Sequence, residues 1–430
     1  MCDGYIINTC TVTAVGDKKS RNAIRRARKQ NPRAIIGVCG CYAQTHLEAV
    51  RLLPVDVIGG SGQRREFLAR MVQACQEQAG DALSSREQVP PEQRNDALSS
   101  CKQSPQEPGD APLPCPRPVR RELVDDALSR REFEILPAGG LLERTRGMLK
   151  VQDGCVNFCS YCIIPYARGP VRSLPIDQAV AQALSCRDMG YRELVVTGIE
   201  ISSWGQDLKN GQTLSDLLMA LCRAVPELRI RLGSLEPRTI TREFCQRMKG
   251  FPNLCPQFHL SLQSGSDRVL KRMNRKYDTA RYRESVELLR QHFPGCAVTT
   301  DLIVGFPGET EEEFAQSLAF LETCRFAWVH VFPYSRRPGT PAARMEGQIP
   351  LAVKETRSAR ALEVAGRLKE ACLASLQGSH QAVLFEQEAQ GLSWGHCPNG
   401  VKVYCPVTGV HNQILSVQLD RPLSLIHILP

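Results

Sequence analysis

The stretch GCVNFCSYC, residues 154–162, holds Cys155, Cys159 and Cys162 in a C-x3-C-x2-C spacing. Thiolates on so short a loop can converge on one small metal core, because little chain entropy is left to lose. A closed zinc site takes four protein ligands, whereas a [4Fe-4S] cluster held by three thiolates leaves one iron free to bind a small molecule. The spacing therefore favours an iron-sulfur cluster, with buried or zinc-binding cysteines as the alternative.

Length and composition indicate a globular chain of two or three domains, since 430 residues with 42% hydrophobic content can bury a large core. No run of 18 or more uncharged apolar residues occurs, and the first residues lack a signal-peptide pattern, so we expect a cytoplasmic protein with no membrane partner. In a reducing compartment the 19 cysteines suit metal sites where clustered and core positions where scattered. The net charge of +9 is a mild bias toward phosphate-bearing partners.

Residues 1–75 alternate apolar, strand-like runs with polar, helical ones, as in a parallel sheet with crossover helices. The expected strands are residues 5–10, 34–41 and 55–60. Ligands of such sheets gather at the carboxyl ends of the strands, where Cys10 and Cys41 fall. These two cysteines are therefore candidate metal ligands, with two buried thiols as the alternative.

Residues 76–140 change character and contain many prolines, glycines, serines and charged residues without apolar periodicity. This composition predicts a flexible insertion between domains. Cys101 and Cys115 lie inside it, and we expect no metal role for either.

Between residues 148 and 335, six apolar runs alternate with helical patterns, which predicts a partial (βα)6 barrel of parallel strands. The expected strands are residues 148–152, 193–200, 229–236, 258–265, 297–307 and 327–335. Chemistry in such barrels sits on the loops at the carboxyl ends of the strands. The cysteine loop falls there, together with a set of glycines and polar residues: Tyr161, Gly198, Glu200, Ser234, Glu236, Gln263 and Gly305.

The carboxyl-terminal part begins with a long amphipathic helix, residues 353–376, followed by four short strand patterns, which are enough for a small β-barrel. Lys402 and Tyr404 in one of these strands could offer charge and stacking to RNA, and a surface lysine beside a half-buried tyrosine is the alternative. Residues 423–430 resemble a translated sequencing adapter, so we expect a non-native tail there.

Three longer sequence motifs follow the cysteine loop along the chain: IPYARG (164–169), HLSLQSGS (259–266) and DLIVGFPGE (301–309). With the loop, they resemble the radical S-adenosylmethionine (SAM) enzymes. The words NTCTVT (8–13) and GCYAQ (40–44) resemble the amino-terminal domain of the methylthiotransferases, a radical-SAM family. The resemblance covers residues 5 to about 420. It implies an α/β fold with a methylthiotransferase domain in 1–75, a radical-SAM domain in 141–375 and a small RNA-binding TRAM β-barrel in 376–422.

The family resemblance implies two [4Fe-4S] clusters, one on Cys155, Cys159 and Cys162 and a second on Cys10 and Cys41. In the family, the third ligand of the second cluster ends an additional strand well before the NTC motif, whereas this sequence starts almost on that motif. We therefore expect an amino-terminally truncated chain that binds one cluster well and the other poorly. Cys2 precedes the strand and Cys39 would face away from Cys41, so neither is a good substitute.

The resemblance also implies that the free iron of the first cluster binds the amino and carboxylate groups of SAM. Glycines such as Gly198 and Gly305 would let the backbone approach the cofactor. Ser234 shares their face of the barrel. Glu200, Glu236 and Gln263 would offer acceptors for the SAM amino group or ribose hydroxyls. Tyr161 would stack near the adenine. A strand-end glutamate can also serve only as a salt-bridge partner.

The family activity implied here is radical methylthiolation, with SAM as methyl donor and as radical source. HLSLQSGS and TGIEISS (197–203) favour the branch that acts on C2 of N6-threonylcarbamoyladenosine beside the tRNA anticodon. The alternatives are the isopentenyladenosine branch and the branch that modifies a ribosomal-protein aspartate. A further alternative is a non-catalytic iron-sulfur RNA-binding protein. The implied partners are the tRNA anticodon loop and an electron donor such as flavodoxin or ferredoxin.

Overall fold

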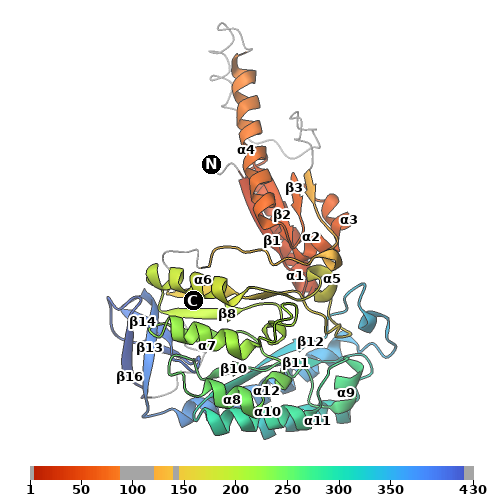
Figure 1. Cartoon of the computed structure of the whole chain (residues 1–430). Coiled ribbons are helices and arrows are strands. Elements are labelled where there is room, and N and C mark those ends of the chain that lie inside the picture. The colour runs from red at the N-terminus through yellow and green to blue at the C-terminus, as the bar shows by residue number, and fades with distance from the viewer. Residues whose placement is uncertain (1–3, 88–120, 139–144, 421–430) are drawn as a thin grey trace. The chain divides into compact units, whose positions relative to one another are not determined.

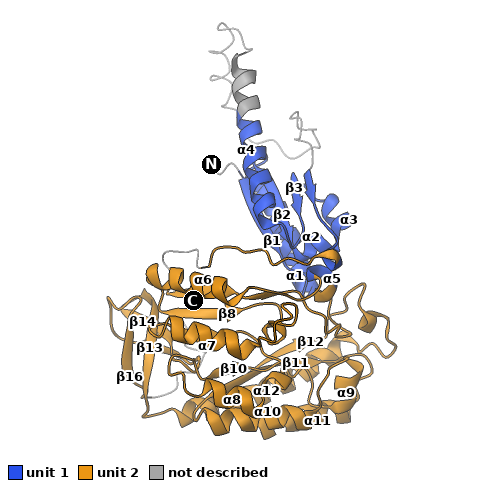
Figure 2. Cartoon of the chain, viewed as in Figure 1, with its two compact units in different colours: residues 1–128, 166–168 blue, residues 129–165, 169–430 orange. Residues whose placement is uncertain are grey.

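The computed structural model describes residues 4–87, 121–138 and 145–420 (Figure 1). The chain forms two units: residues 1–128 with 166–168, and residues 129–165 with 169–430 (Figure 2). No helix in the described ranges combines the length and apolar character that a membrane span requires. Cys2, Cys101, Cys115 and the expected tail at 423–430 lie outside the described residues.

Unit 1 is a parallel sheet with helices, as the alternating sequence pattern predicts. Its strand order is β1-β2-β3-β4, and every neighbouring pair is parallel. β2 is buried along its whole length, because residues on α1 to α3 pack on one face and residues of α4 pack on the other. The elements are β1 Gly4–Thr9, α1 Ala14–Gln30, β2 Ile35–Gly40, α2 Cys41–Thr45, α3 Leu47–Arg51, β3 Val57–Gly59, α4 Arg64–Glu87 and β4 Arg121–Leu123.

Two parts of the expected insertion are elements of unit 1, which the sequence prediction missed. α4 runs on to Glu87, and Arg121–Leu123 forms strand β4. β4 lacks an apolar pattern, but its backbone pairs with β3 from Val57 to Gly59 and its Leu123 carbonyl accepts from Gly60 N at 2.8 Å. Tertiary pairing rather than local propensity forms this strand.

Unit 2 contains the expected partial barrel of six parallel strands, with helices around it (Figure 1). The strands form two sheets, β5-β8-β9 and β10-β11-β12, which backbone bridges from Ile230 to Leu254 and from Leu235 to Leu260 connect. A large apolar core fills the space between the barrel strands and the helices. The strands are β5 Arg146–Lys150, β8 Glu193–Thr197, β9 Arg229–Leu232, β10 Gln257–His259, β11 Ala297–Val304 and β12 Trp328–Pro333.

The helices of the barrel follow the strands in the expected alternation. They are α6 Ile176–Asp188, α7 Leu214–Ala224, α8 Arg242–Met248, α9 Asp267–Arg272, α10 Thr279–His292 and α11 Glu311–Cys324. Local sequence sets their starts: Thr310 and Glu313 form a reciprocal capping box at α11, and Asp278 caps α10. The short pieces are the antiparallel pair β6 Gln152–Asp153 and β7 Arg172–Ser173, helix α5 Ile164–Arg168, and 3-10 turns at Ile201–Ser203, Pro237–Thr239 and Pro341–Arg344. A further 3-10 turn, Ala127–Ser129, follows β4.

The end of unit 2 is helix α12 Leu351–Ser375 followed by an antiparallel sheet of order β15-β14-β13-β16. A register shift between Phe385 and Gln387 marks a bulge in β13. The strands are β13 His380–Ala389, β14 Leu392–His396, β15 Lys402–Cys405 and β16 Ile414–Gln418. The expected α/β fold class is confirmed: a parallel-sheet region, a partial parallel barrel and a small antiparallel β region.

Candidate metal centres and cofactor site

The cysteine loop of unit 2 directly follows β6, and backbone geometry fixes its start. Gly154 has φ +79°, and a Cβ built there would lie 1.8 Å from the Pro170 carbonyl oxygen. Cys155 N donates to the Gly169 carbonyl at 2.9 Å, and Cys162 N donates to the Cys159 carbonyl at 2.9 Å. Only glycine fits this start, so the loop has one well-defined entry into its turn.

The last residue of α9, Asp267–Arg272, and the two residues after it hydrogen-bond to the cysteine loop. Ser160 N donates to the Met273 carbonyl at 3.0 Å and Ser160 Oγ donates to the Arg272 carbonyl at 2.8 Å. Asn274 Nδ2 donates to the Phe158 carbonyl at 2.9 Å. The loop is therefore tied to the barrel before any metal binds.

The thiols and their surroundings fit an anionic cluster. Cys159 is buried, Cys155 and Cys162 are half-buried, and all three are free thiols. Burial raises the pKa of the Cys155 thiol to about 12, so the free side chain is neutral and metal binding must displace its proton. Arg275 Nη1 donates to Cys159 Sγ at 3.3 Å, which places a cation beside the thiols. The sequence analysis did not predict a role for Arg275.

Gly198 and Glu200 lie just beyond the end of β8. A Cβ at Gly198 would meet the Gln152 carbonyl oxygen at 2.8 Å, so the backbone comes close here because there is no side chain. Glu200 N donates to Gln152 Oε1 at 2.8 Å, and its carboxylate accepts from Ser202 N at 3.0 Å. Burial, and then the charge of Glu236, raise the pKa of Glu200. Both glutamates therefore lie in one electrostatic environment, as their predicted shared face requires.

Ser234 and Glu236 follow β9. Ser234 is exposed and lines a pocket of the barrel, whereas Glu236 is buried and its Oε2 accepts from Arg238 Nη2 at 2.7 Å. The salt-bridge alternative for a strand-end glutamate is thus present at Glu236, although within the described residues its other carboxylate oxygen makes no ion pair.

Gln263 and Gly305 both have left-handed backbones beyond β10 and β11. Gln263 has φ +70°, and its backbone N donates to the Asp301 carbonyl at 2.9 Å. Gly305 has φ +69°, and its N donates to the buried Glu309 carboxylate at 2.7 Å. Tyr161 packs against a separate apolar cluster that contains Phe306 and Met273. The structure therefore brings all seven candidate cofactor residues to strand ends and loops of the same barrel.

The two cysteines of unit 1 occupy equivalent positions on neighbouring parallel strands. β1 and β2 pair up to Thr9 and Gly40, so Cys10 and Cys41 are the next residues along each strand. Cys10 is exposed, and Cys41 is buried and begins α2. Arg168 Nε donates to Cys41 Sγ at 3.2 Å. This edge of the sheet carries thiols and a cation, which suits an anionic metal centre.

Cys39 is directed elsewhere. It packs with Phe67 and Met71 on the face that α4 covers, and burial raises the pKa of its thiol. A core role therefore accounts for Cys39.

Lys402 and Tyr404 lie on β15 with an aromatic neighbour from β14. Lys402 Nζ is 4.7 Å from the Tyr404 ring centroid and 5.4 Å from that of Trp394. The two rings are 6.1 Å apart. This aromatic-cation group has the chemistry for base stacking, and Trp394 is a member that sequence reasoning missed because strand pairing brings it in.

Known families match both units. The Radical SAM superfamily model matches residues 149–321, and the model of uncharacterized protein family UPF0004 matches residues 1–60. Among solved structures, the radical S-adenosylmethionine methyltransferase TsrM from Kitasatospora setae aligns with a TM-score of 0.54 at 15% identity, covering 91% of this chain and 67% of that chain. The cysteine loop, the partial barrel and these matches define a radical SAM protein.

Curated relatives narrow the class. The Threonylcarbamoyladenosine tRNA methylthiotransferase MtaB of Bacillus subtilis is 36% identical over 93% of this chain and 81% of its own length. A tRNA-2-methylthio-N(6)-dimethylallyladenosine synthase of Aquifex aeolicus is 32% identical over 90% of this chain and 80% of its own length. The chain belongs to the radical SAM methylthiotransferase family, on the MtaB-like branch. Membership implies SAM and a [4Fe-4S] cluster, which the three-thiol loop fits.

Proposed function

We propose that this protein methylthiolates C2 of N6-threonylcarbamoyladenosine at position 37 of tRNA, with SAM as methyl donor and as radical source. The observation that carries the proposal is the similarity to MtaB proteins, which extends over 93% of this chain and 81% of the Bacillus subtilis protein. The substrate base lies in a single-stranded loop, where an enzyme can take it into a pocket without opening a duplex.

The radical cluster is assigned to Cys155, Cys159 and Cys162. When bound, this cluster and SAM supply the radical that removes a hydrogen atom from an unreactive C–H bond. The protein holds the three thiols on a loop that hydrogen bonds to the barrel keep in place, and it places Arg275 beside Cys159. Glu200, Glu236 and Gln263, with Gly198, Ser234, Gly305 and Tyr161, are assigned to SAM.

A second cluster is assigned to the edge of unit 1 at Cys10 and Cys41. The support is the shared strand register of the two cysteines and the guanidinium of Arg168 at Cys41. In this proposal residues 1–75 carry that cluster, 141–375 the radical chemistry and 376–422 the RNA contact through Lys402 and Tyr404. An electron donor such as flavodoxin or ferredoxin completes the cytoplasmic reaction.

The dimethylallyladenosine substrate is the second candidate, because a synthase acting on it is 32% identical to this chain. Nucleoside mass spectrometry distinguishes the two. The gene is expressed in a bacterial strain that lacks both modifications, and total tRNA is digested. We expect the 2-methylthio derivative of threonylcarbamoyladenosine to appear. If only the 2-methylthio dimethylallyl nucleoside appears, the second candidate replaces the first.

A further inference from the structure

The interior of the partial barrel has an open middle layer. Along β11, Thr300 and Leu302 are buried, whereas Asp301 between them is half-buried. Along β12, Val329 is buried and His330 is exposed. Met148 on β5 is 48% exposed, although its neighbour Leu149 is fully buried. Since strand side chains alternate between faces, the buried set packs under the helices and the accessible set lines the barrel interior.

Below this layer, the amino-terminal end of the barrel is closed. Arg231 Nε donates to Glu193 Oε1 at 2.6 Å, and both side chains are buried. The same guanidinium donates to the carbonyls of Pro398 and Cys397 at 3.0 and 3.2 Å, beyond the end of β14. The carboxyl-terminal sheet thus supplies a floor, and the middle layer is the accessible part of the interior.

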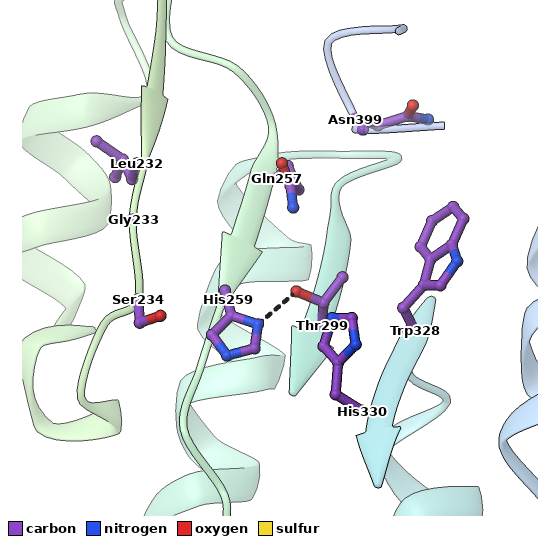
Figure 3. Close-up of a pocket in the computed structure, with 10 residues that line it drawn as sticks. Leu232, Gly233, Ser234, Gln257, His259, Thr299, Trp328, His330 and Asn399 are labelled. Carbon is purple, nitrogen blue, oxygen red and sulfur yellow. Dashed lines mark hydrogen bonds between the residues drawn. The ribbon is translucent and has the colours of Figure 1, made fainter. Parts of the chain in front are cut away.

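On this floor lies a pocket of about 330 Å³ with a polar wall (Figure 3). Its volume is at the small end of the range for ligand pockets, roughly 300–1,000 Å³. In Figure 3 the side chains of His259, Thr299 and His330 point toward one another. The wall also includes Ser234, Gln257 and Asn399.

His259, Asp301 and His330 form one cluster, in which a polar atom of each lies within 4.8 Å of the others. His259 Nδ1 is 2.9 Å from Thr299 Oγ1, and His259 Nε2 is 3.2 Å from Asp301 Oδ2. The His330 ring, centred 6.0 Å from that of His259, makes no hydrogen bond with any residue in the described ranges. His259 is therefore already oriented, and His330 is the member with ring nitrogens available to a ligand.

A backbone hydrogen bond also connects this cluster to a residue that is assigned to SAM. Gln263, assigned above to SAM, donates from its backbone N to the Asp301 carbonyl at 2.9 Å. His259 is the first residue of the HLSLQSGS motif, and Gln263 is the fifth. A group held at the cluster would consequently belong to a substrate that enters the barrel toward the cofactor.

We propose that His330, His259 and Asp301 form the subsite for the threonylcarbamoyl group of the substrate base. The proposal rests on the proposed function. The group offers a carboxylate and carbonyl as acceptors, and a hydroxyl and N–H groups as donors. His330 donates to the carboxylate, Asp301 accepts from the hydroxyl or an N–H, and His259 keeps Asp301 in position. A dimethylallyl group would leave the ring nitrogens of His330 without a partner and the Asp301 carboxylate with His259 alone, which disfavours it.

The same three side chains could instead ligate a divalent cation, since two histidines and a carboxylate are a common ligand set. Direct recognition is the better account of this geometry, because both ring nitrogens of His259 already have partners in Thr299 and Asp301. The test includes metal as a separate arm.

The experiment measures binding by fluorescence anisotropy, with the full chain and an anticodon stem-loop RNA. The RNA carries threonylcarbamoyladenosine, dimethylallyladenosine or plain adenosine at one position. We expect the wild type to prefer the first RNA, and His330→Ala and Asp301→Asn to reduce that preference about tenfold or more. His292→Ala, at the end of the outer helix α10, is the matched histidine control and should keep the preference.

An unchanged preference in His330→Ala would overturn the subsite, whereas the nucleoside measurement above tests the proposed function separately. A lower affinity for all three RNAs alike would also overturn it, because general RNA contact would then explain the loss. Binding is repeated with EDTA and with added Zn²⁺ or Mn²⁺. A preference that EDTA abolishes and metal restores would replace direct recognition with a metal site and would overturn the proposal.

Discussion

The two thiol sites are built in opposite ways. In unit 2, the three cysteines lie on one loop, which its own backbone and the segment after α9 hold in place. In unit 1, Cys10 and Cys41 directly follow two different strands, and the register of β1 and β2 brings them to the same end of the sheet. A site made by a loop is specified locally, whereas a site made at a sheet edge depends on the folding of the whole sheet. The two sites should therefore respond differently to substitution.

The largest expected effect is at the loop. Cys159→Ala removes one of three ligands of the radical cluster, so we expect reductive SAM cleavage to fall to background. Iron and sulfide analysis of the reconstituted protein, with chromatography of 5'-deoxyadenosine, measures both. Cys372→Ala, a half-buried cysteine on α12, is the control and should retain cleavage. Cleavage that survives in Cys159→Ala would remove the cluster from this loop.

At the sheet edge, Cys41→Ala should act on a different readout. We expect it to lower the iron bound in excess of the radical cluster while reductive SAM cleavage stays within about twofold of the wild type, since the loop thiols are untouched. The same assays apply, with Cys39→Ala as a neighbouring control whose thiol packs under α4. Equal losses of cleavage in Cys41→Ala and Cys159→Ala would contradict the separation of the two sites.

Each thiol site has a glycine whose substitution should lower the stability of its own unit. An added Cβ at Gly154 would lie 1.8 Å from the Pro170 carbonyl oxygen, and one at Gly40 would lie 2.4 Å from the Thr9 carbonyl oxygen. Both residues have positive φ, so we expect Gly154→Ala and Gly40→Ala each to cost about 3 kcal/mol or more. Gly190 has φ +84° with open space around it, so Gly190→Ala isolates the backbone cost of roughly 1–2 kcal/mol.

Hydrogen exchange of the metal-free protein measures where each glycine substitution acts. Gly154→Ala should increase exchange in unit 2, and Gly40→Ala in unit 1. Gly190→Ala should cause the smallest increase of the three. If Gly154→Ala were no more destabilising than Gly190→Ala, the close approach to Pro170 would not constrain the loop.

Sequence periodicity was sufficient for the features that local pattern controls. The six barrel strands, the first strands of unit 1 and the position of the cysteine loop all follow from alternation of apolar runs and helices. Strand β4 could not be predicted, because Arg121–Leu123 has no strand pattern and pairs only once β3 exists. The contact of Arg275 with Cys159 spans 116 residues, and the cluster of His259, Asp301 and His330 needs the register of β10 to β12. Such contacts depend on tertiary structure.

The smallest expected effect concerns the arginine that contacts a cysteine sulfur at each of the two sites. Arg275 Nη1 donates to Cys159 Sγ at 3.3 Å, and Arg168 Nε donates to Cys41 Sγ at 3.2 Å. A hydrogen bond from a cation stabilises the reduced, more negative cluster, so Arg275→Gln should make the potential of the radical cluster more negative, on the order of tens of millivolts. Redox titration followed by electron paramagnetic resonance measures this at unchanged iron content.

Arg168→Gln is the matched variant for this test, because it removes the same charge from the sheet-edge site. It should leave the potential of the radical cluster unchanged, since the sulfur that Arg168 contacts belongs to Cys41. An equal shift in both variants would mean that the charge acts at long range, and the contact with Cys159 would then have no special role. A shift in Arg275→Gln alone would tie the tuning of the loop cluster to a residue that the loop itself does not contain.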